Sequence, residues 1–180
     1  MSGSERFDAW RASVAAIFSC EPRAPEEIDG FVARVTAFDL GSVLFAESAA
    51  SGQRFVRSER LIRSTDIDHL MIQWYRRGGY RGMHAGDDVT VSPGDVSVLD
   101  LSRPFKTRIA GDHFHNCNIF IPRNFLLPQL RSGRALHSLR LSVDSALGRI
   151  FTRFLAATAE ELPHATQAEI PTITQSIVGI

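Results

Sequence analysis

The middle of the chain alternates between hydrophobic and polar residues, whereas both ends space their apolar residues as helices do. In the first segment the apolar residues recur every three or four positions, which predicts an amphipathic helix over residues 7–18. That spacing is carried by Phe7, Trp10, Val14, Ile17 and Phe18. Two prolines and a glycine follow within residues 20–30, so we predict a loop there.

From residue 31 to residue 121 the period changes to two, and Gly, Pro and Asp interrupt the apolar runs. The predicted strands are 31–38, 42–47, 53–57, 69–76, 80–83, 88–91, 96–100, 105–109 and 114–121, with a single helical turn at 59–64. Many short strands joined by tight turns favour an antiparallel β-barrel or jelly roll, because closure removes exposed strand edges.

After Pro122 the helical period returns. We predict a short helix at 123–130, a longer helix capped by Ser142, and a last helix after Pro171. The stripe of the longer helix consists of Val143, Leu147, Ile150, Phe151, Phe154, Leu155 and Leu162. The predicted organisation is therefore a leading helix and loop (1–30), a barrel (31–122) and a helical segment (123–180), which makes the fold mainly β with α.

Residues 91–109, VSPGDVSVLDLSRPFKTRI, contain two turns that separate short strands. Pro93, Gly94 and Asp95 suit a tight reversal, and Ser102, Arg103 and Pro104 suit a second one. The polar residues Asp100, Ser102 and Arg103 are either contacts to a ligand or parts of the turn. We favour the turn, in which Asp100 and Ser102 act as caps and Arg103 pairs with a nearby carboxylate.

The pattern PGDxxxxDxSRPF in this segment resembles the effector-sensing domain at the N-terminus of AraC-family transcription regulators. The resemblance continues, in order, over roughly residues 5–160. It is carried by Phe7-Asp8-Ala9-Trp10-Arg11, by Asp68-His69-Leu70-Met71-Ile72-Gln73 followed by Gly78, and by Phe120-Ile121-Pro122-Arg123. It implies a cupin-like barrel that binds a small effector, helices that dimerise, and a DNA-binding domain with two helix-turn-helix units expected downstream of Ile180.

The balance of basic and acidic residues argues against direct binding of DNA by this chain. Basic and acidic residues number 20 each, so no net field attracts nucleic acid or an anionic membrane. We therefore expect DNA contact only through the downstream domain. The polar start and the lack of a long apolar run predict a cytoplasmic protein, in which Cys20 and Cys117 are buried free thiols.

The strand predicted at 69–76 offers the best candidate for an effector pocket. Met71, Gln73 and Tyr75 share one face and combine apolar area with hydrogen-bonding groups, as ligand pockets do. That face is alternatively a half-solvated outer surface, whereas Leu70, Ile72 and Trp74 on the other face indicate core. We also count His115 among the candidate effector-binding residues, as a histidine expected to line the barrel.

His113 and His115 also define the alternative function, a cupin metalloenzyme such as a dioxygenase or isomerase. Alternate residues of a strand share a face, so the two imidazoles would point toward one metal. A cupin metal site, however, draws on a further histidine and a carboxylate, and its paired histidines precede the Pro-Gly turn, whereas here they follow it. We therefore expect no metal, no cofactor and no catalytic residues.

The apolar stripe of the longer C-terminal helix packs either on the barrel alone or on both the barrel and a second copy of the chain. Packing on the barrel accounts for part of it, but its width suggests a second partner. The predicted dimer contacts are Leu147, Ile150, Phe151, Phe154 and Leu155. The sequence thus predicts a homodimer.

Overall fold

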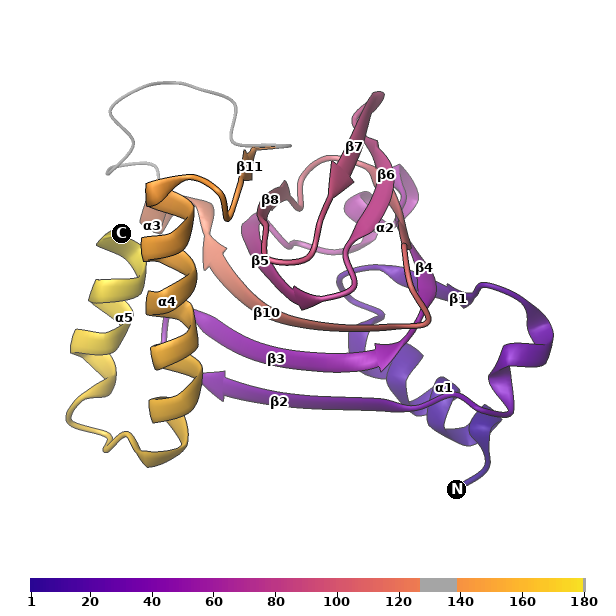
Figure 1. Ribbon diagram of the computed structural model, residues 1–180, viewed down its shortest axis with the longest axis horizontal. Coiled ribbons are helices and arrows are strands. Elements are labelled where there is room, and N and C mark those ends of the chain that lie inside the picture. Colours follow the sequence, from indigo (N-terminus) through magenta and orange to yellow (C-terminus); the bar gives the residue numbers. More distant parts are fainter. Residues whose placement is uncertain (127–138, 180) are drawn as a thin grey trace.

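Two antiparallel sheets face each other, with a helix at one end and a helical hairpin against one sheet (Figure 1). The structure is a computed structural model that describes residues 1–126 and 139–179. The strands are β1 (Ser19–Pro22), β2 (Ala33–Asp39), β3 (Leu44–Ser51), β4 (Gln53–Arg57), β5 (His69–Arg77), β6 (Tyr80–His84), β7 (Asp87–Val91), β8 (Val96–Asp100), β9 (Phe105–Ile109), β10 (His113–Pro122) and β11 (Arg140–Leu141). The helices are α1 (Gly3–Val14), α2 (Glu59–Ser64), α3 (Arg123–Leu126), α4 (Ala146–Glu161) and α5 (Ile170–Gly179), with short 3₁₀ turns at Pro25–Ile28 and Leu162–His164.

The strand order is that of a jelly roll. One sheet has the order β1-β4-β9-β6-β7, and the other has the order β11-β8-β5-β10-β3-β2. Most neighbours are not consecutive in sequence, so the chain crosses repeatedly between the sheets. The prediction of a mainly β, jelly-roll fold is confirmed, although the two sheets do not join into one closed cylinder.

The six-stranded sheet separates two hydrophobic cores. The first core lies between the sheets and includes Phe7, Trp10 and Val14 of α1 packed on Phe55, Tyr75 and Phe114. The second core lies between the other face of that sheet and the α4–α5 hairpin, where Leu155, Ile177 and Val178 meet Phe45, Cys117 and Ile119 (Figure 1). Strands β5 and β10 are therefore covered on both faces.

Two local predictions are wrong. The segment predicted as a loop after Cys20 begins with β1, which pairs with β4 through Cys20 opposite Phe55. Helix α4 is capped by Ser145 and not by Ser142, because the Ser145 hydroxyl accepts a hydrogen bond from the Gly148 amide at 2.9 Å. Ser142 instead closes the preceding turn, where its carbonyl accepts from the Ser145 amide at 3.1 Å.

The other predicted elements agree with the structure apart from their bounds. The predicted helix at 123–130 begins as α3, and its part beyond Leu126 lies outside the described residues. Cys20 and Cys117 are buried free thiols, as predicted. Burial raises the pKa of Cys117 to about 12, so this thiol stays protonated.

A fully buried arginine joins α1 to the sheets. The Arg57 side chain, on β4, donates from Nε to the Leu101 carbonyl at 2.5 Å and from a terminal nitrogen to the Ile17 carbonyl at 2.5 Å. It also contacts the Ala16 carbonyl and the Thr65 hydroxyl, each at 3.3 Å. No carboxylate pairs with it in the described part of the chain, and burial lowers the pKa of its guanidinium. Neutral acceptors alone hold this charge.

Replacing this arginine should destabilise the fold. We expect Arg57→Met to lower the free energy of unfolding by about 2–4 kcal/mol, since buried carbonyls lose their donors. Arg54→Met, on the same strand but exposed and without an ion pair to a described residue, should change it by less than about 0.5 kcal/mol. Urea denaturation of the two variants tests this, and equal losses of stability would contradict it.

Candidate functional site

A cavity of about 280 Å³ lies between the two sheets beneath α1. Its wall is formed by side chains from α1 and its following turn, and from β2, β3, β4, β5, β8, β9 and β10. The lining residues are Trp10, Ser13, Val14, Ile17, Phe18, Val35, Ala37, Leu44, Ala46, Ser48, Phe55, Met71, Gln73, Tyr75, Leu99, Phe105, Thr107, Phe114, Asn116, Asn118 and Phe120. This volume is just below the usual range for small-molecule sites, about 300–1,000 Å³.

One wall of the cavity is polar. Gln73 of β5 lies opposite Asn118 of β10 in the strand register, and its Nε2 donates to Asn118 Oδ1 at 2.9 Å. Asn118 Nδ2 in turn donates to Asn116 Oδ1 at 3.0 Å, and lies 3.5 Å from the Ser48 hydroxyl. Asn116 is also hydrogen-bonded to the side chain of Tyr75. These buried side chains form a continuous polar row on the inner face of the six-stranded sheet.

Helix α1 covers one side of the cavity. The Trp10 indole N–H donates to Gln53 Oε1 at 2.9 Å, which fixes the helix to the start of β4. The cavity meets solvent beside β2, where Val35 is 48% exposed and Ser13 of α1 is also exposed. A small molecule would therefore reach the interior between the helix and this edge strand.

The structure distinguishes the two interpretations of β5. Met71, Gln73 and Tyr75 point into the cavity, so the alternative of a half-solvated outer face is wrong. Ile72 and Trp74 pack on the opposite side of the sheet, in the core beneath the hairpin.

His115 lies outside the cavity, which corrects its placement among the pocket residues. On β10 the even-numbered residues from Phe114 to Phe120 face inward, so His115 projects from the outer face. Its Nε2 lies 2.8 Å from Glu47 Oε1, an oxygen that also accepts from Arg76 at 2.9 Å.

The proposed metal pair does not converge on the interior either. His113 is exposed and His115 is occupied by Glu47, and neither lines the cavity. Within residues 1–126 and 139–179, no three His, Cys, Asp or Glu side chains are grouped as metal ligands. The geometry therefore gives no support to the cupin metalloenzyme.

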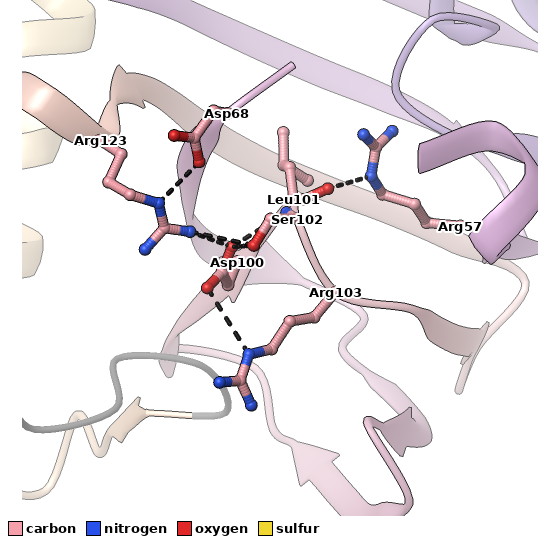
Figure 2. Close-up of polar contacts among 7 residues, drawn as sticks. All are labelled: Arg57, Asp68, Asp100, Leu101, Ser102, Arg103 and Arg123. Carbon is pink, nitrogen blue, oxygen red and sulfur yellow. Dashed lines mark hydrogen bonds and ion pairs between the residues drawn. The ribbon is translucent and has the colours of Figure 1, made fainter. Parts of the chain in front are cut away.

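The polar residues of the second turn bind one another and not the cavity (Figure 2). Asp100 Oδ1 accepts from the Ser102 amide at 2.9 Å and from its hydroxyl at 2.7 Å. Arg123, the first residue of α3, donates to Asp100 at 2.5 Å and to Asp68 at 2.6 Å. Arg103 Nε is 3.8 Å from Asp100 Oδ2. Pro104 follows this network as an exposed turn residue.

The first turn attaches the sheets to the C-terminal segment. In the Pro93-Gly94-Asp95 turn, Gly94 adopts φ +91°, and a Cβ there would meet Val143 at 3.0 Å. The Asp95 carboxylate accepts from the Ser92 amide at 3.0 Å, from Arg140 at 3.1 Å and from the Val143 amide at 3.3 Å. The turn therefore fixes the chain just before α4.

The predicted dimer stripe divides between two environments. Leu155 is fully buried, and Phe151 and Phe154 pack against the second core, so these residues support the hairpin from within. The burial of Leu155 corrects its assignment as a dimer contact, whereas Phe151 and Phe154 are only partly buried and stay predicted contacts. Leu147 and Ile150 are 61% and 63% exposed, which leaves them accessible on the surface of α4.

Sequence reasoning missed the two asparagines and Trp10 as cavity residues. The alternation Phe114-x-Asn116-x-Asn118-x-Phe120 was visible, because it places two amides and two rings on one face of a strand. The spacing of Trp10 indicates an amphipathic helix and carries no separate signal for a cavity.

The chain belongs to the AraC-binding-like domain family, whose pattern it matches over residues 8–179. It is similar to the AraC-like transcriptional activator CuxR, whose crystal structure superposes with a TM-score of 0.87 at 25% identity. That similarity covers 97% of this chain and 64% of CuxR. These similarities support a ligand-sensing regulatory domain.

Two further proteins extend the comparison. A Bacillus sp. (strain OxB-1) protein, described as an uncharacterized protein in the nit 5′ region, is 25% identical over 127 residues, covering 71% of this chain and 49% of its own length. A cupin 2 conserved barrel domain protein from Salinispora arenicola CNS-205 gives a TM-score of 0.39 at 12% identity, covering 51% and 77% of the two chains. This chain thus spans less than two thirds of CuxR and about half of the Bacillus protein. No helix among its described residues is long and apolar enough to cross a membrane.

The Asp100 network predicts a loss of stability in acid. Burial alone would raise the pKa of Asp100, but the hydrogen bonds from Arg123 and Ser102 outweigh it and hold the pKa below its ordinary value of 3.8. The stabilisation is therefore fully present above the unfolded pKa, near 3.8, and is lost as the pH falls through the lower folded value.

Asp100→Asn should accordingly cost roughly 1.5–3 kcal/mol at pH 7, the range for hydrogen bonds to a charged group. The difference from wild type should begin to shrink as the pH falls to about 3.8, where the unfolded chain takes up a proton, and should vanish below the lower pKa of the folded state. Urea denaturation at several pH values measures both. Asp66→Asn, at an exposed site two residues from Asp68, is the control, and a pH-independent difference for Asp100→Asn would refute the expectation.

Proposed function

We propose that this chain is the effector-sensing and dimerisation part of an AraC-type transcription regulator. The observation that carries the proposal is the cavity between the sheets, which is lined by a row of buried polar side chains and by a cluster of aromatic rings. Buried polar side chains grouped beside an empty volume are typical of a small-molecule site. Membership of the AraC-binding-like family and similarity to a transcriptional activator support this use of the cavity.

In this proposal the chain acts as a cytoplasmic homodimer, and a domain outside residues 1–180 contacts DNA. The effector binds in the cavity, while Leu147 and Ile150 of α4 contact a second copy. Effector binding shifts the arrangement of the helices only by the difference between its affinities for the two arrangements. The chain itself carries balanced charge, which is consistent with a role other than direct DNA contact.

Filling the cavity should abolish effector binding. Small metabolites that bind the cavity will raise the melting temperature of the wild-type chain, because a ligand of the native state stabilises it. Ala46 lines the cavity, and Ala46→Leu should reduce such shifts by weakening binding about tenfold or more, since overpacking costs about 1–3 kcal/mol.

Ala49→Leu is the matched control, because Ala49 lies on the same strand but faces outward, opposite His115. It should leave the ligand-induced shifts unchanged. Compounds whose shifts are the same in Ala46→Leu and wild type would show that the cavity is not their binding site.

Self-association should depend on the exposed apolar residues of α4. We expect Ile150→Glu to convert a dimer into a monomer without loss of secondary structure, because it places a charge in an apolar contact. Arg149→Glu, elsewhere on the exposed surface of the same helix, should stay dimeric. Sedimentation velocity and circular dichroism give the two readouts, and an Ile150→Glu variant that sediments as a dimer would exclude this surface.

A further inference from the structure

The cavity excludes ionised side chains from its wall. Among the described residues that line it there is no Asp, Glu, Lys, Arg or His. Tyr75 is the one titratable group on its polar wall, and burial raises its pKa far above neutrality, so it stays uncharged. A charged ligand would therefore lose its hydration without meeting a counter-ion, which is a large cost in an apolar interior.

The Gln73 side chain, at one end of the polar row, has a hydrogen-bonding group left for a ligand. Gln73 donates to Asn118, and Asn118 donates to Asn116, so the bonds run in one direction along the row. Gln73 Oε1 then accepts from no described residue and remains available to a donor in the cavity. If the oxygen and nitrogen of all three side-chain amides were exchanged, the hydrogen bonds would run the other way. Gln73 would then offer an N–H group to the cavity instead of an oxygen. In either arrangement a ligand group that both donates and accepts satisfies it.

Much of the remaining wall is aromatic. Phe55 and Phe105 come from the five-stranded sheet, Phe114 from β10 and Trp10 from α1. Their rings form a connected cluster, with the Phe55 and Phe114 centroids 5.9 Å apart and those of Trp10 and Phe114 6.4 Å apart. Such a wall favours the flat apolar face of a ligand.

We propose that the effector is an uncharged molecule with a flat apolar body and an edge that carries a carboxamide or hydroxyl group, and not a carboxylate, phosphate or amine. The apolar body packs on the aromatic wall, and the polar edge bonds to Gln73 at the end of the amide row. This inference rests on the proposed function, because it assigns a ligand class to the same cavity.

Three probes that share one aromatic ring separate the contributions. Benzamide offers an uncharged polar edge, benzoate replaces it with a charge, and benzene lacks it. Occupancy can be followed by NMR through the two tryptophan indole N–H signals. Trp10 lines the cavity, whereas Trp74 lies on the outer face of β5, with its ring 5.2 Å from the Arg76 guanidinium, and is the internal reference.

We expect benzamide to shift the Trp10 signal with an affinity about tenfold higher than that of benzene and at least tenfold higher than that of benzoate, a ratio within reach of one or two buried hydrogen bonds. Gln73→Met should remove the preference for benzamide over benzene. Ile72→Val, on the opposite face of the same strand and outside the cavity, should keep it. If Gln73→Met does not fold, the relative affinities of the three probes for the wild-type chain still test the proposed ligand class.

The outcomes separate the inference from the function on which it rests. Benzoate binding as tightly as benzamide, or benzene binding as tightly as benzamide, would overturn the proposed ligand class while leaving a cavity that binds small molecules. No shift of Trp10 with any of the three probes, at concentrations up to the solubility of benzene, would overturn the proposed function itself.

Discussion

The buried guanidinium of Arg57 is the constraint on which the cavity depends. A charge in the interior is tolerated only when its donors find acceptors, and here these come from three separate places in the chain. The Ala16 and Ile17 carbonyls lie in the turn after α1, Leu101 lies in the turn before β9, and Thr65 follows α2. Because Ile17 and Phe18 line the cavity, the same bonds fix its wall.

Polar residues in the motifs singled out from the sequence likewise hold separate segments of the chain together. Asp68 precedes β5, Asp100 ends β8 and Arg123 follows β10, and the three side chains meet in one ion-pair network (Figure 2). Asp95 similarly connects the first turn to Arg140 and Val143. None of these residues lines the cavity. The residues that hold the segments together and those that line the cavity are therefore separate sets.

Much of the fold was predictable from residue spacing, because turns and the two-residue period are local properties. The period alone does not say which face of a strand points inward, however, and on β10 both faces are apolar enough to be buried. The outer face is covered by the hairpin, so Cys117, Ile119 and Ile121 are as buried as Phe114. His115 lies on this outer face, and the strand period does not show that this face points away from the cavity. Arg57 was unpredictable for a related reason, since its acceptors are backbone carbonyls and no sequence pattern marks them.

The two cores explain how one sheet can connect a ligand with a distant surface. On β5, Gln73 faces the cavity while its neighbours Ile72 and Trp74 pack beneath the hairpin, and on β10 Asn118 faces the cavity while Cys117 and Ile119 do the same. Adjacent residues of a strand move together because the backbone that joins them is stiff over that distance. The Tyr75 backbone is also bonded to Gly94 and Asp95, at 2.7 and 3.1 Å, and Asp95 holds the chain before α4. Under the proposed function, a ligand that pairs with the amide row thus acts on the two strands that support the hairpin. Its effect on the hairpin is limited by how differently it binds the two arrangements, so a tight ligand that fits both equally would change nothing.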